Sequence, residues 1–303
     1  MAMTAILRQM KLLDGTGDPP REDVMLVVRD GKVAYAGEEA SWRPGPDEET
    51  TTLNLPGRTV LPGLIDCHVH LAMDGAPDSR LQGDLGWTAL LMLKHAQNSL
   101  AAGVTTVRDV GGQHGLEFAL RCAIADGLWA GPRLVLSGKL LSITSAGAEY
   151  YDGMYREADG QDEVRKAARE QLKAGADWIK VLATGAVLTP GELPGAPQFS
   201  LDELRAAAEE AHNAGKHLAA HAHGLHGIRN AVEAGARTIE HGTYLYQDER
   251  LMAAMAERSI YLVPTLKTGF DVLQGDRPGI PDWIREKMKQ VQEDALRSVS
   301  KAH

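Results

Sequence analysis

The sequence has few cysteines, no basic run and no long apolar run, and each absence narrows the class of protein. Two cysteines, Cys67 and Cys122, are too few for a disulfide framework in 303 residues, which fits a reducing compartment. A formal net charge of −9 without a basic run disfavours nucleic-acid binding. No apolar run approaches the roughly 20 residues that a membrane span needs, and the N-terminus lacks the apolar core of a signal peptide. We therefore expect a soluble, cytoplasmic protein that binds neither nucleic acid nor membrane.

The pattern of the sequence changes near residue 58, and 303 residues have room for one large domain and a small one. Residues 4–57 contain short β-strand patterns separated by turn residues. Residues 24–37 predict a hairpin, because Asp30-Gly31 supplies the positive φ angles of a two-residue turn. We expect residues 1–57 to form the N-terminal part of a small β-sandwich.

Residues 58–303 repeat strand, loop and helix, and the helical patterns end at glycine, which suits the left-handed C-cap position. One helix begins at a capping-box pattern, Ser200 to Glu203. This alternation predicts a parallel α/β fold of the TIM-like (β/α)8 barrel type, with its active site at the carboxyl ends of the strands.

The strand count of this predicted barrel is seven rather than eight. Strand patterns lie near residues 65, 105, 135, 180, 219, 239 and 262. An amphipathic helix pattern from Trp283 to about Lys301 follows, and no eighth strand pattern comes after it. We therefore expect a chain that is a fragment, that has lost its tail, or that is completed by a second polypeptide.

A His-x-His pattern lies at the end of the first barrel strand. Residues i and i+2 of a strand point to the same face, so His68 and His70 should present two imidazoles side by side. A single His-x-His pattern is more often structural than metal-binding, but here a Pro62-Gly63 turn and an apolar segment precede it. Two converging neutral imidazoles favour a transition-metal site.

Three further candidate ligands lie on later strands. Lys180 interrupts an apolar strand, where a charged amine is expensive to bury unless it pairs with a carboxylate or reaches solvent. His221 and His241 end the fifth and sixth strands, where either alone would more often be structural. Together with the first histidine pair, these side chains should project into one space at the barrel mouth.

The segment from Leu61 to His70 resembles the first-strand signature of the amidohydrolase superfamily. His221 opens a His-Ala-His-Gly motif and His241 lies in Ile-Glu-His-Gly, which are also similar to this family. The resemblance covers almost the whole chain and is to the Xaa-Pro dipeptidase-like subgroup, near imidazolonepropionase. It implies two divalent metal ions, expected to be zinc, and N-carboxylation of Lys180 to a carbamate that bridges them. The implied metal ligands are His68, His70, Lys180, His221 and His241.

The same resemblance implies a general base, an aspartate at the end of strand eight, which cannot be placed. Asp271 and Asp276 lie in the loop expected after strand seven. Ser142 to Ala148 stands where the subgroup often has Gly-Gly-His-Gly, so the expected histidine is absent and a plain prolidase assignment is weakened. The side chains expected to face substrate are His223, His226, Tyr151 and His114.

The predicted reaction is hydrolysis of the amide bond of small peptides or N-acyl amino acids by a metal-activated hydroxide. The sequence has no Gly-x-Ser-x-Gly pattern, which argues against serine chemistry of the α/β-hydrolase type. One alternative is hydrolysis of cyclic amides or other small N-acyl compounds. Another is a truncated, inactive chain that binds metal or a partner. The unpaired barrel edge predicts a homo-oligomer or association with a missing C-terminal segment.

Overall fold

The computed structural model describes residues 4–45, 48–73, 83–274 and 279–303. Contacts between Cα atoms divide the chain into two compact units, residues 1–64 and 65–303. Asp276 lies outside the described residues. No helix in the described part of the chain is both long enough and apolar enough to cross a membrane.

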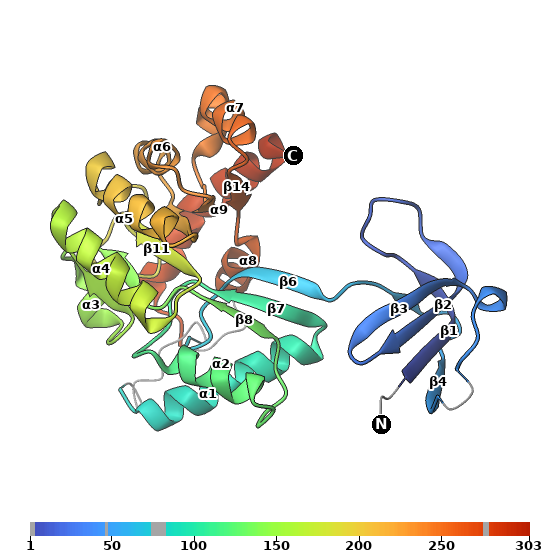
Figure 1. Cartoon of the computed structure of the whole chain (residues 1–303). Coiled ribbons are helices and arrows are strands. Elements are labelled where there is room, and N and C mark those ends of the chain that lie inside the picture. The colour runs from blue at the N-terminus through green and yellow to red at the C-terminus, as the bar shows by residue number, and fades with distance from the viewer. Residues whose placement is uncertain (1–3, 46–47, 74–82, 275–278) are drawn as a thin grey trace. The chain divides into compact units, whose positions relative to one another are not determined.

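The first unit is one five-stranded β-sheet (Figure 1). Its elements are β1 (Thr4–Leu12), β2 (Arg21–Arg29), β3 (Lys32–Glu38), the short helix η1 (Glu39–Ser41), β4 (Thr50–Asn54) and β5 (Thr59–Val60). The strand order is β3-β2-β1-β4, and β5 pairs with β1. The predicted hairpin is β2–β3, and positive φ angles of 51° at Asp30 and 71° at Gly31 form its turn. Ile6, Met25 and Val27 form the core.

The second unit contains two sheets in which the described ladders are all parallel (Figure 1). The first has the order β6-β7-β8 and the second the order β10-β9-β11-β12-β13-β14. The bounds are β6 (Leu64–Val69), β7 (Val104–Asp109), β8 (Arg133–Leu136), β9 (Leu140–Ser142), β10 (Tyr155–Glu157), β11 (Trp178–Leu182), β12 (His217–Ala222), β13 (Thr238–His241) and β14 (Tyr261–Val263).

The chain passes from the first sheet to the second between β8 and β9, which only residues 137–139 separate. Ser137 N donates to Asp109 O at the end of β7, and Asp177 N donates to Leu136 O of β8. The strands at all seven predicted positions are present, in chain order, which is an α/β arrangement of the TIM-like kind. Among the described strands, none pairs with the outer edge of β6 or of β14.

Helices separate most of the parallel strands. Their bounds are α1 (Leu85–Ala101), α2 (Leu116–Ala125), α3 (Ala146–Tyr150), α4 (Gln161–Ala174), α5 (Leu201–Asn213), α6 (Leu225–Ala234), η2 (Leu245–Gln247), α7 (Glu249–Glu257), α8 (Leu266–Gln274) and α9 (Asp282–Ala302). The predicted capping box is present at the start of α5, where Ser200 and Glu203 cap each other. The expectation of a loop after strand seven was wrong at Asp271, because this residue lies on α8.

The largest core cluster lies between strands β11–β13 and the helices α4–α6 that cover them (Figure 1). Ile179 and Val181 belong to this cluster. Because side chains alternate along a strand, Lys180 between them points to the opposite, inner face. The alternation of side chains along β11 therefore directs the amine of Lys180 to the face of the sheet that is not covered by helices α4–α6.

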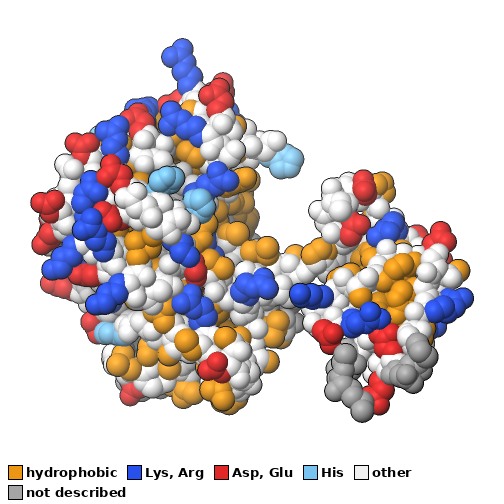
Figure 2. Space-filling model, in the orientation of Figure 1, with side chains coloured by type: hydrophobic (Ala, Val, Ile, Leu, Met, Phe, Trp, Pro, Cys, Tyr) orange, Lys and Arg blue, Asp and Glu red, His pale blue; other side chains and the backbone are white. Residues whose placement is uncertain are grey.

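Charged side chains of both signs are mixed over the surface of this unit. Figure 2 shows Lys and Arg beside Asp and Glu over the helices, without a continuous basic area among the described residues of that face. The mixed surface agrees with the acidic net charge of −9.

Candidate metal centre

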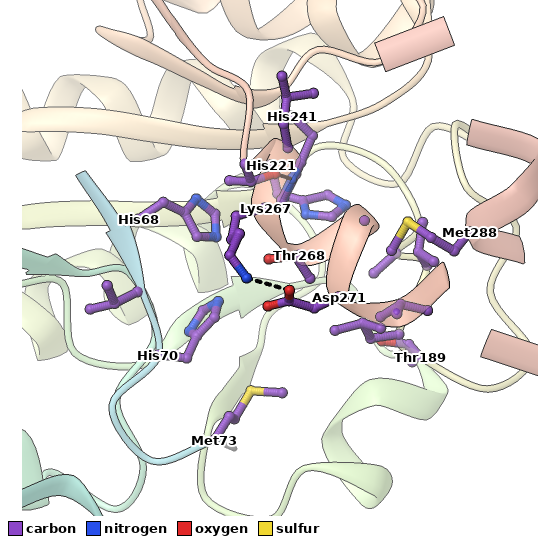
Figure 3. Close-up of a pocket in the computed structure, with 18 of the residues that line it drawn as sticks. His68, His70, Met73, Thr189, His221, His241, Lys267, Thr268, Asp271 and Met288 are labelled. Carbon is purple, nitrogen blue, oxygen red and sulfur yellow. Dashed lines mark hydrogen bonds and ion pairs between the residues drawn. The ribbon is translucent and has the colours of Figure 1, made fainter. Parts of the chain in front are cut away.

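A cavity of about 570 Å³ opens at the carboxyl ends of the parallel strands (Figure 3). Strands β6, β11, β12 and β13 each bring at least one candidate ligand to its wall. The ligand-bearing residues of the wall are His68, His70, Lys180, His221, His223 and His241. The structure thus brings the five predicted metal ligands into one cavity, together with His223.

His68 of β6 and His70, which directly follows the strand, lie side by side, as the i, i+2 spacing predicts. Their ring centroids are 5.3 Å apart, and the ring of His68 lies 5.0 Å from that of His241 across the cavity. The Nδ1 of His68 is 2.7 Å from a carboxylate oxygen of Glu240. The Nδ1 of His70 donates to the carbonyl oxygen of Gly111 at 3.1 Å. Each ring therefore keeps its Nε2 for a ligand in the cavity.

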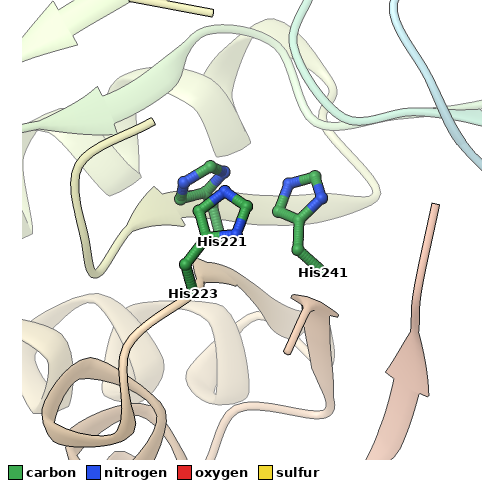
Figure 4. Close-up of side chains that lie close together, drawn as sticks. All are labelled: His221, His223 and His241. Carbon is green, nitrogen blue, oxygen red and sulfur yellow. The ribbon is translucent and has the colours of Figure 1, made fainter. Parts of the chain in front are cut away.

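His221, His223 and His241 form a second group of imidazoles (Figure 4). One ring nitrogen of each lies within 4.8 Å of those of the other two, a spacing that fits one metal ion. The ring of His223 stacks on that of His241, with centroids 4.8 Å apart. Sequence reasoning separated His223 from the ligands as a substrate-facing residue, but its buried ring lies in the same group.

Hydrogen bonds to the protein fix which nitrogen of these rings remains available. His221 donates through Nε2 to the carbonyl oxygen of Gly185 at 3.3 Å, which leaves Nδ1 with its lone pair. The Nδ1 of His241 is 2.7 Å from the hydroxyl of Thr265, and that hydroxyl donates to the carbonyl oxygen of Pro264. The hydroxyl must therefore accept from His241, whose Nε2 is left for a ligand.

Burial keeps the imidazoles of the cavity in their neutral form. Desolvation lowers the pKa of His70 and of His223 to about 3. The pKa values of His221 and His241 lie well below 6.5 for the same reason, with neighbouring histidines adding to the effect. Neutral imidazole is the form that binds a metal ion, so at neutral pH these rings need no deprotonation first.

Lys180 is the buried amine among these rings. Its side chain is 1% exposed, and no described residue gives its Nζ a hydrogen-bond partner. Burial lowers the pKa of Lys180 to about 8, Glu240 opposes this shift and Arg108 adds to it. An orphaned amine surrounded by neutral imidazoles fits a lysine that carries a bridging group between metal ions, because that group would supply the missing partners.

Two charged pairs near the cavity were missed by sequence reasoning. Glu240 and Arg108 are buried and joined at 2.7 Å, behind His68. Lys267 and Asp271 of α8 are paired and line the cavity (Figure 3). The signal for Glu240 is the one that identified Lys180, a charge inside an apolar strand. No comparable signal marks α8, since its helix depends on tertiary packing.

The remaining residues predicted to face substrate divide into two groups. Tyr151 lines the cavity and donates through its hydroxyl to the carbonyl oxygen of Leu188 at 2.8 Å. His226 is exposed on the first turn of α6, and His114 pairs with Asp152 at 3.1 Å. Neither His226 nor His114 is among the described residues that line the cavity.

Comparisons with known proteins agree with this site. Residues 59–300 match the amidohydrolase family, and the chain belongs to it. Members of this family generally use divalent metal ions. The chain is 32% identical to an ochratoxinase of Aspergillus niger over 291 residues, which cover 87% of this chain and 59% of that protein. It is 26% identical to an imidazolonepropionase of Rhizorhabdus wittichii, over 82% of this chain and 66% of that protein.

Solved structures show the same likeness. A Xaa-Pro dipeptidase with bound methionine in the active site superposes with a TM-score of 0.88 at 30% identity, over 99% of this chain and 76% of that chain. The crystal structure of the A. niger ochratoxinase gives a TM-score of 0.84 at 30% identity, over 99% and 73%. The chain thus matches these structures over nearly all of its own length, but spans 59% of the length of the curated ochratoxinase.

Proposed function

We propose that this chain carries the metal centre of a binuclear amidohydrolase that cleaves the amide bond of small peptides or N-acyl amino acids. The observation that carries the proposal is the buried amine of Lys180, which has no hydrogen-bond partner among the described residues and lies among imidazoles from three other strands. A structural lysine in this position would pair with a carboxylate or reach solvent. A metal-bridging lysine has the surroundings that are found here.

In this proposal His68, His70, Lys180, His221 and His241 hold two divalent ions, expected to be zinc, with Lys180 carboxylated. When bound, such ions polarise a carbonyl group and lower the pKa of water to near neutrality. The chain's own contribution is a set of neutral rings, each held by a hydrogen bond from its other nitrogen. The general base remains assigned to an aspartate of an eighth strand, which the described strands do not provide.

The outer wall of the cavity supports a substrate with an apolar side chain. Val187 and Leu188 of the loop after β11 pack with Met288 and Val291 of α9 in one apolar cluster, and all four side chains line the cavity. Tyr151 adds an aromatic ring to the same wall. The solved Xaa-Pro dipeptidase holds methionine, an apolar amino acid, in its active site. These features favour amides of apolar amino acids, or apolar acyl groups, over highly charged substrates.

The test is a screen of the zinc-loaded protein, in a form that includes the eighth strand to which the general base is assigned, against dipeptides and N-acyl amino acids, with a cyclic amide included for the alternative reaction. We expect release of the free amino acid, fastest for apolar residues, and loss of the activity in the Lys180→Ala variant. Turnover of the cyclic amide alone would favour the imidazolonepropionase-like reaction. Undiminished activity in Lys180→Ala, or no hydrolysis of any amide, would overturn the proposal.

A further inference from the structure

A buried ionic network lies directly behind the first metal-ligand candidate. It joins His68 of β6 and Arg108 of β7, which are neighbouring strands of one sheet, to Glu240 of β13 in the other sheet. The side chain of Glu240 is 0% exposed and that of Arg108 is 6% exposed. Burying two charges costs free energy unless their hydrogen bonds are satisfied. A buried ionic network beside a candidate metal ligand therefore suggests a function for these charges.

The hydrogen bonds of Glu240 divide unequally between its two oxygens. Oε1 accepts from Thr238 Oγ1 at 2.5 Å and from Arg108 at 2.7 Å. Oε2 lies 2.7 Å from the Nδ1 of His68. The guanidinium of Arg108 is itself fixed, because its Nε donates to the carbonyl oxygen of Cys67 at 2.6 Å and its plane lies over the ring of Trp178. The carboxylate therefore has one orientation.

This arrangement determines the tautomer of His68. A carboxylate oxygen only accepts hydrogen bonds, so the Nδ1 of His68 must carry the hydrogen and the Nε2 keeps its lone pair. The ring lines the cavity, where that lone pair is available to a ligand. We propose that Glu240 is a positioning residue that fixes His68 in its metal-binding tautomer, with Arg108 holding the carboxylate. This inference rests on the proposed function, since it concerns the same metal centre.

A carboxylate is required at this position rather than any polar group. In a Glu240→Gln variant, Arg108 and Thr238 would both still donate to one side-chain oxygen. The amide NH2 would then take the place of Oε2 and face His68. Two donors cannot pair, so the ring would turn its lone pair at Nδ1 toward the amide and carry its hydrogen on Nε2. The substitution thus inverts the tautomer and blocks the nitrogen that faces the cavity.

The experiment reads the tautomer of His68 in the metal-free full-length protein by long-range 1H–15N correlation with labelled histidine. We expect hydrogen on Nδ1 in the wild type and on Nε2 in Glu240→Gln. Zinc titration should then show a 10- to 100-fold weaker affinity of the variant, the range typical for loss of an outer partner of a ligand. Thr238→Val is the matched control, because it removes a donor to Oε1 and leaves the carboxylate on His68; its tautomer and zinc affinity should stay unchanged.

Two results would overturn the inference. One is hydrogen on Nε2 of His68 in the wild type, a measurement that does not depend on whether any variant folds. The other is a Glu240→Gln variant, folded by circular dichroism, that keeps both the wild-type tautomer and zinc affinity within twofold. A wild type that shows the expected tautomer but binds no zinc would support the positioning by Glu240 and refute the proposed metal centre, so the two failures are distinct.

Discussion

Lys180 is the residue on which the proposed chemistry of the cavity most depends. Its amine lies 1% exposed among neutral imidazoles, and burial lowers its pKa to about 8. A lysine with this pKa is partly neutral at physiological pH, and only the neutral amine can add carbon dioxide to form a carbamate. Burial of the amine, which lowers its pKa, thus favours its proposed role as a bridge between metal ions.

We predict that Lys180→Ala loses bound metal. Removing the bridge leaves only imidazoles from β6, β12 and β13, so zinc content measured by elemental analysis should fall by at least half relative to the wild type. The matched control is Lys173→Ala, an exposed lysine at the end of α4. Equal zinc content in Lys180→Ala and the wild type would count against the bridge.

Glu117 is 1% exposed, and its two carboxyl oxygens have no hydrogen-bond partner among the described residues. Burial, and secondarily Asp109, raise the pKa of Glu117 from 4.5 to about 7. The native state therefore holds a proton that the unfolded state releases, so this carboxyl costs stability as pH rises from about 4.5 to 7.

The Glu117→Gln variant removes this cost. Relative to the wild type, its free energy of unfolding should increase progressively between pH 5 and 7 and level off by pH 8, by a total of about 3 kcal/mol. Denaturant unfolding of the metal-free protein measures this difference, with the exposed Glu233→Gln of α6 as control. A difference that is constant over this pH range would contradict the raised pKa.

At the scale of elements, α9 holds the loop that forms the apolar wall of the cavity. Lys287 donates to the carbonyl oxygens of Thr189 and Glu192 at 2.7 and 2.5 Å. The hydroxyl of Tyr151 donates to the carbonyl oxygen of Leu188 in the same loop. Charge-assisted bonds of this kind contribute about 1.5–3 kcal/mol each. The position of the loop, and of its Val187, therefore depends on a helix distant in sequence.

We predict that Lys287→Ala raises KM for apolar amide substrates about tenfold, because the apolar wall of the cavity loses its two hydrogen bonds to α9. A tenfold change corresponds to roughly 1.4 kcal/mol of substrate-binding free energy. The turnover number should change little, since Lys287 touches none of the candidate metal ligands. Lys289→Ala is the matched control, an exposed lysine of the same helix that pairs with Glu286. An unchanged KM, or a loss confined to kcat, would refute this role.

The elements that sequence reasoning found, and the one that it missed, differ in what stabilises them. Strand β11 was predictable because Ile179 and Val181 alternate with Lys180, and α5 because Ser200 begins it. Helix α8 was missed because Gly269 in its middle lowers helix propensity. A Cβ at Gly269 would meet Gln292 of α9, so packing between the two helices, which no local pattern reveals, determines this element.

The site, like the elements, was predictable where local patterns mark it and not where tertiary contacts determine it. Histidines at strand ends identify the wall of a barrel mouth, so His68, His70, His221 and His241 could be proposed together from spacing and resemblance. Their hydrogen bonds to Glu240, Gly111, Gly185 and Thr265 join segments far apart in sequence, so the choice of tautomer at each ring could not be predicted. Sequence thus predicts which strands bear the ligands, and the fold determines which nitrogen each offers.

At the scale of the whole molecule, apolar side chains remain on the surface. Leu64 and Ile65 of β6 are 53% and 66% exposed, on a strand whose outer edge has no described neighbour. Hydrophobic side chains also gather at the lower end of the larger unit in Figure 2, near α1, where Leu90 is 65% exposed. An unpaired strand edge with apolar side chains favours pairing with another chain.

We predict that the 303-residue chain associates in solution and that Ile65→Lys weakens the association. A lysine on an edge strand opposes edge-to-edge pairing through charge repulsion and the cost of desolvation. Light scattering across a concentration series measures the mass. A clean monomer at all concentrations, or an association that Ile65→Lys leaves unchanged while Leu90→Lys removes it, would contradict the role of the β6 edge.

We expect His68, His70, Lys180, His221 and His241 to surround a pair of metal ions. Anomalous diffraction at the zinc edge from crystals of the zinc-loaded protein tests it most directly. We predict two peaks in the cavity, about 3.5–4 Å apart, with Lys180 between them and the histidines at the ends of β6, β12 and β13 around them. Zinc bound elsewhere on the protein, or a cavity without any peak at full zinc loading, would contradict it.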